Sequence, residues 1–148
     1  MQKPIQHGLI ALVLSAFAFS AWAQSAAVGV WRTIDDETKT AKSHVRIAEA
    51  NGSLEGTVVE ILDSAKRAEI CTLCTDERKD KPKLGMVILR KLKAESKDGS
   101  EWGDGEILDP NNGKTYRASI KVIEGGKKLQ VRGYIAFFYR TQVWERVE

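Results

Sequence analysis

The chain has 148 residues, with 23 lysines and arginines, 20 aspartates and glutamates, and two cysteines. Without its first 23 residues, which include Lys3, it keeps 125 residues carrying 22 basic and 20 acidic side chains, a length typical of one domain. These charges are interspersed, whereas a nucleic-acid-binding protein carries a basic face or stripe, so nucleic acid is not expected as a partner.

The first 23 residues have the features of a secretory signal peptide. Lys3 gives a positive start, an apolar run follows from Leu9 to Phe19, and Ala21 and Ala23 place small residues where a signal peptidase reads. Because about 20 apolar residues are needed to cross a bilayer, this run is too short for a membrane span. We predict a cleaved signal peptide over residues 1–23, cut near Ala23/Gln24, and a periplasmic or secreted domain over residues 24–148.

The rest of the chain is predicted to be a series of short strands. Asn51-Gly52 is a strong signal for a two-residue hairpin turn. Within Tyr116–Val122, apolar and polar residues alternate, which is typical of an antiparallel sheet with one buried face. The predicted strands are Val28–Ile34, Ser43–Ala50, Ser53–Leu62, Leu84–Lys93, Glu101–Leu108, Thr115–Ile123, Lys128–Ile135 and Thr141–Val147.

About eight evenly spaced strands predict an all-β domain, either an up-and-down β-barrel or a sandwich. An eight-stranded barrel has an interior that is filled by side chains or holds one small ligand. One segment, Asp63–Lys83, shows no alternation and is expected to be a long loop, with a short helix over Ser64–Ile70. The charged run Arg78–Lys83 inside it is expected to be solvated.

The two cysteines, Cys71 and Cys74, form a C-x-x-C in this long loop. In an oxidising compartment two nearby thiols usually form a disulfide, and we favour that interpretation. A redox couple would begin a helix in a βαβ unit, which the chain lacks, so redox chemistry is the weaker alternative. Zinc normally takes four ligands, while the cleaved chain has one histidine, so we expect no metal and no cofactor.

Several charged residues alternate with apolar ones. Arg90 and Glu60 each share a strand face with apolar neighbours, whereas His44 lies opposite Val45 and Ile47 and is expected to face solvent. If the apolar faces line a barrel, Arg90 would meet a ligand carboxylate or pair with Glu60, because an unpaired buried charge is costly. The favoured interpretation is that both lie near strand ends and reach solvent.

The ends of the domain also carry a signal. Trp31 lies in the first predicted strand and Arg146 in the last, so the guanidinium is expected to lie over the indole and help close one end of a barrel.

An ordered set of short blocks extends over essentially the whole predicted domain. The blocks are Gly29-Val30-Trp31, Asp35-Asp36, Cys71-x-x-Cys74, Gly85–Leu89, Gly105-x-Ile107-Leu108-Asp109-Pro110, Asn112-Gly113-Lys114-x-Tyr116, Val131–Tyr134 and Thr141-Gln142-x-Trp144. Together they resemble a family of secreted bacterial proteins of unknown function with a lipocalin-like (calycin-type) β-barrel. The sequence differs from the usual family pattern at Lys39 and at Tyr139-Arg140, both in predicted connections between strands. The resemblance implies a barrel able to enclose a small apolar ligand, and it implies no reaction.

These observations predict an exported binding protein with no catalytic residues, whose partner is a small hydrophobic or amphipathic ligand. The alternative is a periplasmic protein-interaction module with a filled barrel core and a working surface at the rim or at the long loop Asp63–Lys83. Exposed aromatic side chains within Val131–Tyr139 would indicate such a partner site. The candidate ligand-lining residues are Met86, Ile88, Trp102, Tyr116, Ile120 and Val131, with Arg90 as the polar anchor.

Overall fold

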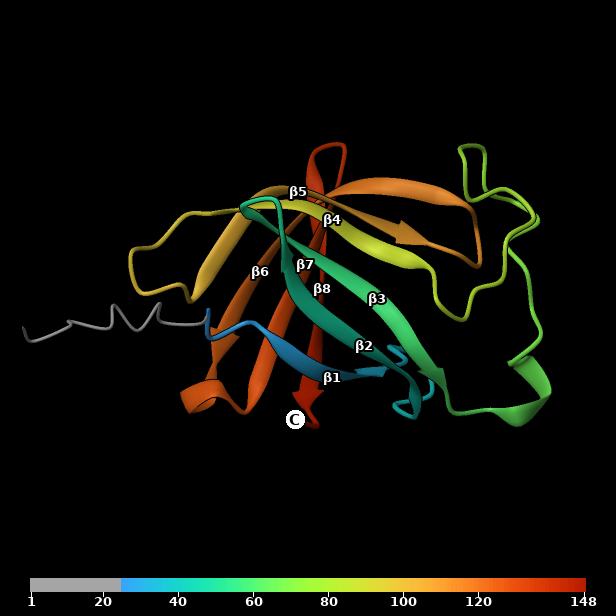
Figure 1. Cartoon of the computed structure of the whole chain (residues 1–148), viewed down its shortest axis with the longest axis horizontal. Helices are drawn as coiled ribbons and strands as arrows, with labels where there is room; N and C mark the ends of the chain where they lie inside the picture. Colours follow the sequence, from blue (N-terminus) through green and yellow to red (C-terminus); the bar gives the residue numbers. More distant parts are fainter. Residues whose placement is uncertain (1–24) are drawn as a thin grey trace, which may run out of the picture.

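The computed structural model describes residues 25–148, so the predicted signal peptide lies outside the described residues. Eight strands follow one another in chain order around a closed antiparallel barrel, and the last pairs with the first (Figure 1). This confirms the predicted all-β, up-and-down barrel. The strands are β1 (Gly29–Ile34), β2 (Ala41–Ala50), β3 (Ser53–Ile61), β4 (Val87–Ala94), β5 (Glu101–Asp109), β6 (Lys114–Ile123), β7 (Lys128–Ile135) and β8 (Phe138–Arg146).

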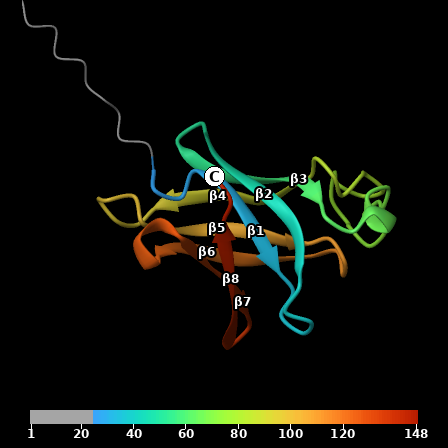
Figure 2. The ribbon, with the colours of Figure 1, turned by 90° about the horizontal axis from the view of Figure 1, so that it is seen from below.

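The connections lie alternately at two ends of the barrel. One end, which we call the closed end, carries the start of the domain, the β2–β3 and β4–β5 turns, the short 3-10 helix η2 (Glu124–Gly126) and the C-terminus (Figures 1 and 2). The other end, which we call the mouth, carries the β1–β2, β5–β6 and β7–β8 turns and the long β3–β4 connection. No helix within residues 25–148 is long and apolar enough to cross a membrane.

Trp31 fills the closed end. Its side chain is fully buried, its Nε1 donates to the carbonyl of Ala27 at 2.9 Å, and the Cζ atom of Arg146 lies 4.1 Å from the ring centroid. The Arg146 guanidinium also donates to the carbonyl of Val28 at 3.1 Å. The segment before β1 is thus held across this end of the barrel.

The middle of the barrel is filled by large apolar side chains. Gly56 of β3 belongs to this layer, because a Cβ atom built on it would lie 3.0 Å from Leu89 and 3.1 Å from Val45. The side chains with less than 2% exposure include Trp31, Val45, Ile47, Leu54, Leu89, Leu92, Leu129 and Trp144. Interior side chains at native density account for most of the stability of such a barrel.

The pairing of β3 with β4 is irregular. Leu54, Gly56 and Thr57 face Leu92, Leu89 and Val87, so β4 uses extra residues at two places. Lys91 adopts a left-handed backbone conformation with φ of 62°. Extra residues of this kind are β-bulges, and each resets the alternation of side chains between the two faces of a strand.

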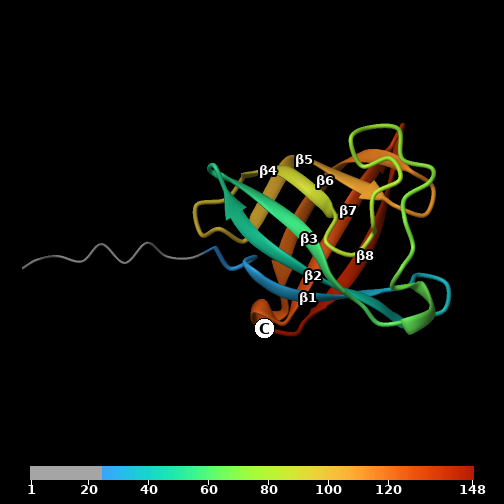
Figure 3. The same ribbon diagram turned by 45° about the vertical axis from the view of Figure 1, so that its right-hand side comes forward.

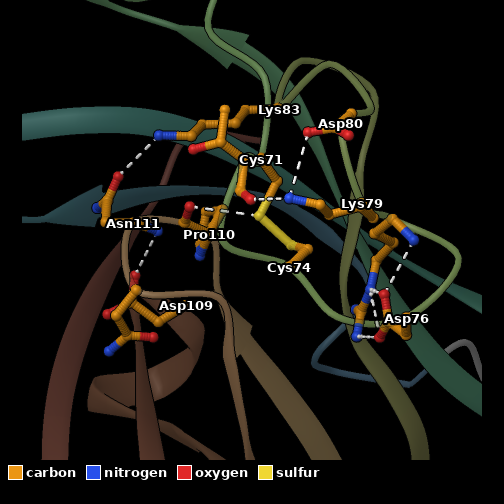
Figure 4. Close-up of a disulfide and its surroundings, with 12 residues drawn as sticks. Cys71, Cys74, Asp76, Lys79, Asp80, Lys83, Asp109, Pro110 and Asn111 are labelled. Atoms are coloured by element: carbon orange, nitrogen blue, oxygen red, sulfur yellow. Dashed lines mark hydrogen bonds and ion pairs between the residues drawn. A yellow bond between two sulfur atoms is a disulfide. The ribbon is translucent and has the colours of Figure 1, made fainter.

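The long connection between β3 and β4 lies against the outside of the barrel near the mouth (Figure 3). It contains one 3-10 turn, η1 (Ser64–Lys66), which is shorter than the predicted helix. The predicted disulfide is confirmed, since Cys71 and Cys74 are bonded and almost completely buried. Figure 4 shows the bond beside Pro110 in the β5–β6 turn.

One residue of the charged run in this loop is not solvated as predicted. Arg78 is only 7% exposed: its Nε donates to Asp76 at 3.1 Å and its Nη1 donates to the carbonyl of Val87 at 2.9 Å. Its Nη2 also reaches the hydroxyl of Thr115 at 3.3 Å. A guanidinium has five donors, so one arginine fastens the loop to both β4 and β6.

Candidate functional site

The mouth end of β8 carries polar side chains on the face that is apolar deeper in the barrel. Trp144 pairs across the sheet with Leu129, and both are buried. Two residues nearer the mouth, Gln142 pairs with the buried Val131, and Arg140 follows at the rim. Because successive alternate residues of a strand share a face, these three side chains form a line from the core to the rim.

Hydrogen bonds connect this line to the β1–β2 turn. Trp144 Nε1 donates to Gln142 Oε1 at 3.0 Å, and Gln142 Nε2 donates to Asp36 Oδ2 at 3.0 Å. The same carboxylate oxygen lies 2.6 Å from Arg140 Nη2. An indole N–H can only donate, so it fixes the Gln142 amide with its oxygen toward the core and its NH2 group toward the mouth.

The preceding residue, Asp35, shapes the turn that presents Asp36. Its Oδ1 accepts hydrogen bonds from the backbone N–H groups of Glu37 and Thr38 at 2.9 and 2.8 Å, and its Oδ2 lies 3.1 Å from Lys42. The Thr38 N–H bond and then the Lys42 ammonium hold the pKa of the Asp35 carboxyl far below its usual range. Asp35 is therefore used within the turn, while Asp36 points across the mouth to β8.

An apolar, partly exposed wall lies beside these polar groups. Gly133 of β7 pairs with Arg140 on one side and with the buried Ala118 on the other. A Cβ atom on Gly133 would meet only Ile107 at 3.7 Å and Tyr116 at 3.9 Å, which is ordinary contact. Ile107 and Tyr116 are half-buried, unlike the sealed layer below them.

The structure separates the predicted lining residues into two groups. Tyr116 lies at the mouth, where its hydroxyl accepts a hydrogen bond from Asn112 Nδ2 at 3.2 Å. The others are 2–7% exposed and belong to the packed core: Met86, Ile88, Trp102, Ile120 and Val131. Met86 also borders a hollow between the long loop and β4, and Ile120 borders one on the outer wall. For Ile88, Trp102 and Val131, contact with a ligand stays a prediction and requires the core to open.

Arg90 lies on the outer wall and is partly exposed, in keeping with the favoured interpretation that it reaches solvent, and it does not take the alternative interior position of a ligand anchor. The β-bulges turn it to the outer wall, where its Nε lies 2.9 Å from Glu106 and its Nη1 lies 2.7 Å from Glu77. The hydrogen bond to Glu106 raises the pKa of the Arg90 guanidinium above its ordinary value. The pairing with Glu60 that belonged to the interior alternative is also not found, because Glu60 lies 2.7 Å from Nδ1 of His44. The His44 side chain is only 16% exposed, so the prediction that it faces solvent was wrong.

Two hollows lie on the outer wall of the barrel. One, of about 320 Å³, is lined by polar side chains of β5, β6 and β7, among them Glu101, Gln130 and Arg132. The other, of about 370 Å³, lies between the long loop and β4 beside Arg78 and Arg90.

The tip of the β7–β8 hairpin exposes aromatic side chains. Phe137 and Phe138 are 105% and 63% exposed, and Tyr139 is 56% exposed. Tyr139 stacks edge-on with Tyr134 at 6.2 Å between ring centroids, and Arg132 lies 4.1 Å over Tyr139.

Asp36, Arg140 and Gln142 were not chosen as site residues from the sequence. Arg140, Gln142 and Trp144 are spaced two residues apart, which indicates that they share one face of a strand. Arg140 was missed because the last strand was predicted to start at Thr141, whereas pairing continues to Ile135 and Phe138 around the turn. Gln142 lies inside the predicted strand and was not recognised as a site residue. The contact with Asp36 joins residues more than 100 positions apart, and no local pattern indicates it.

Comparison with known proteins agrees with this architecture. A solved structure described as "Protein HP1028 from the human pathogen Helicobacter pylori belongs to the lipocalin family" superposes with a TM-score of 0.70 at 21% identity, covering 82% of each chain. At this identity the likeness shows the fold, which is lipocalin-like. No curated protein matches the chain. Residues 29–146 match the bacterial family described as "Uncharacterized protein conserved in bacteria (DUF2147)", and the chain belongs to that family.

Proposed function

We propose that this protein, once exported and cleaved near Ala23/Gln24, is a periplasmic or secreted binding protein that takes up a small amphipathic ligand at the mouth of its barrel. It acts by binding, and no residue is assigned a catalytic role. The observation that carries the proposal is the composition of the mouth, where a half-exposed apolar wall adjoins the polar line of Gln142 and Arg140. A ligand with an apolar body and a polar group matches such a surface.

The position of Gly133 supports this proposal. A Cβ atom here would contact Ile107 and Tyr116 at ordinary distances, so this part of the mouth is less tightly packed than the core around Gly56. The core below is sealed, so the ligand occupies the mouth first and reaches deeper residues such as Val131 only if the core rearranges.

Native mass spectrometry of the protein recovered from the periplasm, followed by solvent extraction, tests the proposal. We expect a bound small molecule in the wild type and its loss in Gly133→Leu, because leucine fills the mouth. Gln130→Leu is the matched control, since it adds the same side chain to the same strand on the outer wall. Retention of the molecule by Gly133→Leu would show that it binds elsewhere.

A second candidate function is a protein-interaction module, and the exposed β7–β8 tip favours it. Solvent-exposed Phe137, Phe138 and Tyr139 beside Arg132 have the composition of interaction hot spots. If the wild type is recovered empty while Phe137→Ser loses a partner that the wild type captures, this second function replaces the first.

A further inference from the structure

The mouth presents two hydrogen-bond donors from the barrel wall. Arg140 and Gln142 both lie on β8, and the Gln142 amide is held with its NH2 group outward by Trp144. Both groups meet at a single carboxylate oxygen, Oδ2 of Asp36, at 2.6 and 3.0 Å. A guanidinium and an amide NH2 converging on one oxygen form a carboxylate-binding arrangement.

The carboxylate that fills this arrangement belongs to a connection rather than to the wall. Asp36 lies in the β1–β2 turn. The described backbone pairing of β1 with β8 and the residues after it involves Val30, Trp31 and Arg32, all near the closed end. The seam between β1 and β8 has no described backbone pairing at the mouth. Asp36 can therefore move away with its turn while the two donors stay fixed in the wall.

We infer that the ligand is an amphipathic carboxylate whose head replaces Asp36 at Arg140 and Gln142. Its apolar body lies along Ile107, Tyr116 and Gly133. Asp36 is an internal substitute that pairs with the two donors when no ligand is bound. This inference rests on the binding function proposed above and adds the chemical class of the ligand.

Three probes with the same 12-carbon chain separate the head groups: laurate, dodecanol and dodecyltrimethylammonium, titrated calorimetrically below their micelle concentrations. We expect laurate to bind the wild type about tenfold more tightly than dodecanol, because it gains charge-assisted hydrogen bonds. The ammonium probe should bind most weakly.

Two variants test the assigned residues. Arg140→Gln should remove the preference for laurate and leave dodecanol binding unchanged. Asp36→Asn should raise laurate affinity by about tenfold, because the competing internal carboxylate is gone. Arg117→Gln is the matched control, since this arginine lies over Tyr134 on the outer wall and its loss changes the net charge equally.

Other results would overturn the inference. Equal affinities for laurate and dodecanol in both the wild type and Asp36→Asn would exclude a carboxylate site while leaving the binding function in place. Preference for the ammonium probe would assign Asp36 rather than Arg140 as the recognition group. If no 12-carbon probe binds any of these proteins, the proposed function and this inference both fail.

Discussion

At the residue scale, two inward-facing glycines have opposite surroundings. A Cβ atom on Gly56 would lie 3.0–3.1 Å from Leu89 and Val45, whereas one on Gly133 would meet no atom closer than 3.7 Å. We predict that Gly56→Ala lowers the free energy of unfolding by about 1–3 kcal/mol, because it overpacks the core. Gly133→Ala should leave that free energy unchanged or raise it by up to about 1 kcal/mol, since glycine weakens a strand.

Urea denaturation of the two variants beside the wild type measures this difference. Equal destabilisation by both substitutions would show that the mouth is packed as tightly as the core, and would count against ligand binding there.

Residue-scale prediction from sequence succeeded where alternation is regular and failed at the bulges. Ile120 and Val131 were placed correctly in the interior because β6 and β7 pair without a register shift. The alternative interior position of Arg90 failed because β4 carries extra residues, and nothing in its sequence shows where a bulge will fall. The candidate site was missed for a related reason, since Arg140 lies beyond the predicted start of its strand.

At the element scale, the long β3–β4 loop depends on the contact of Asp76 with Arg78. The hydrogen bond from the Arg78 side chain lowers the pKa of Asp76 to about 2. The unfolded value is about 3.9, so the contribution of this contact to stability is complete above about pH 5 and is lost as the pH falls through about 2. We predict that Asp76→Asn costs on the order of 1 kcal/mol at pH 7, and less at pH 2.

Unfolding free energies of wild type and Asp76→Asn at the two pH values test this prediction. Asp80→Asn is the control within the same loop, because Asp80 contacts only the exposed Lys79 through its side chain. A difference between wild type and Asp76→Asn that is the same at pH 2 and pH 7 would show that the carboxylate charge is not what holds Arg78.

The same loop shows what the sequence can predict about a segment in which apolar and polar residues do not alternate. Its length and its disulfide were predictable, because Cys71 and Cys74 are three residues apart in a chain predicted to be exported. The position of the loop on the barrel was not predictable, because contacts with distant turns determine it. Gly113 of the β5–β6 turn, for example, lies so close to Leu73 that a Cβ atom on Gly113 would be 1.9 Å from the Leu73 carbonyl oxygen. Buried Arg78 follows from the same long-range contacts.

At the scale of the whole molecule, the barrel was predictable because almost all of its strand pairs join segments that are neighbours in the sequence. Each strand pairs with its neighbours in sequence, and turns such as Asn51-Gly52 fix those pairs. Closure of the sheet by β1 and β8 is the one pairing between distant strands, and it was expected from Trp31 and Arg146. The sequence does not indicate how far the pairing of β1 with β8 extends toward the mouth.

This incomplete seam leads to a prediction about opening of the barrel. At the mouth, described contacts join the β1–β2 turn to β8 through Asp36, which is 25% exposed, and Arg140, which is 58% exposed. A partly exposed ion pair is worth at most about 1 kcal/mol, so Asp36→Ala should speed amide exchange in residues 33–40 by about twofold to fivefold. Hydrogen exchange with mass spectrometry measures this rate.

Glu37→Ala is the control, because Glu37 lies in the same turn and its side chain makes none of the described hydrogen bonds or ion pairs. Exchange in residues 53–58 of β3 should be the same in both variants, since Leu54 and Val58 belong to the sealed core. If Asp36→Ala and Glu37→Ala exchange alike, the contact with Arg140 does not hold the seam closed. If the whole barrel exchanges faster in Asp36→Ala, the mouth and the core open together, and a ligand that displaces Asp36 would then gain access to Val131 and Ile120 as well.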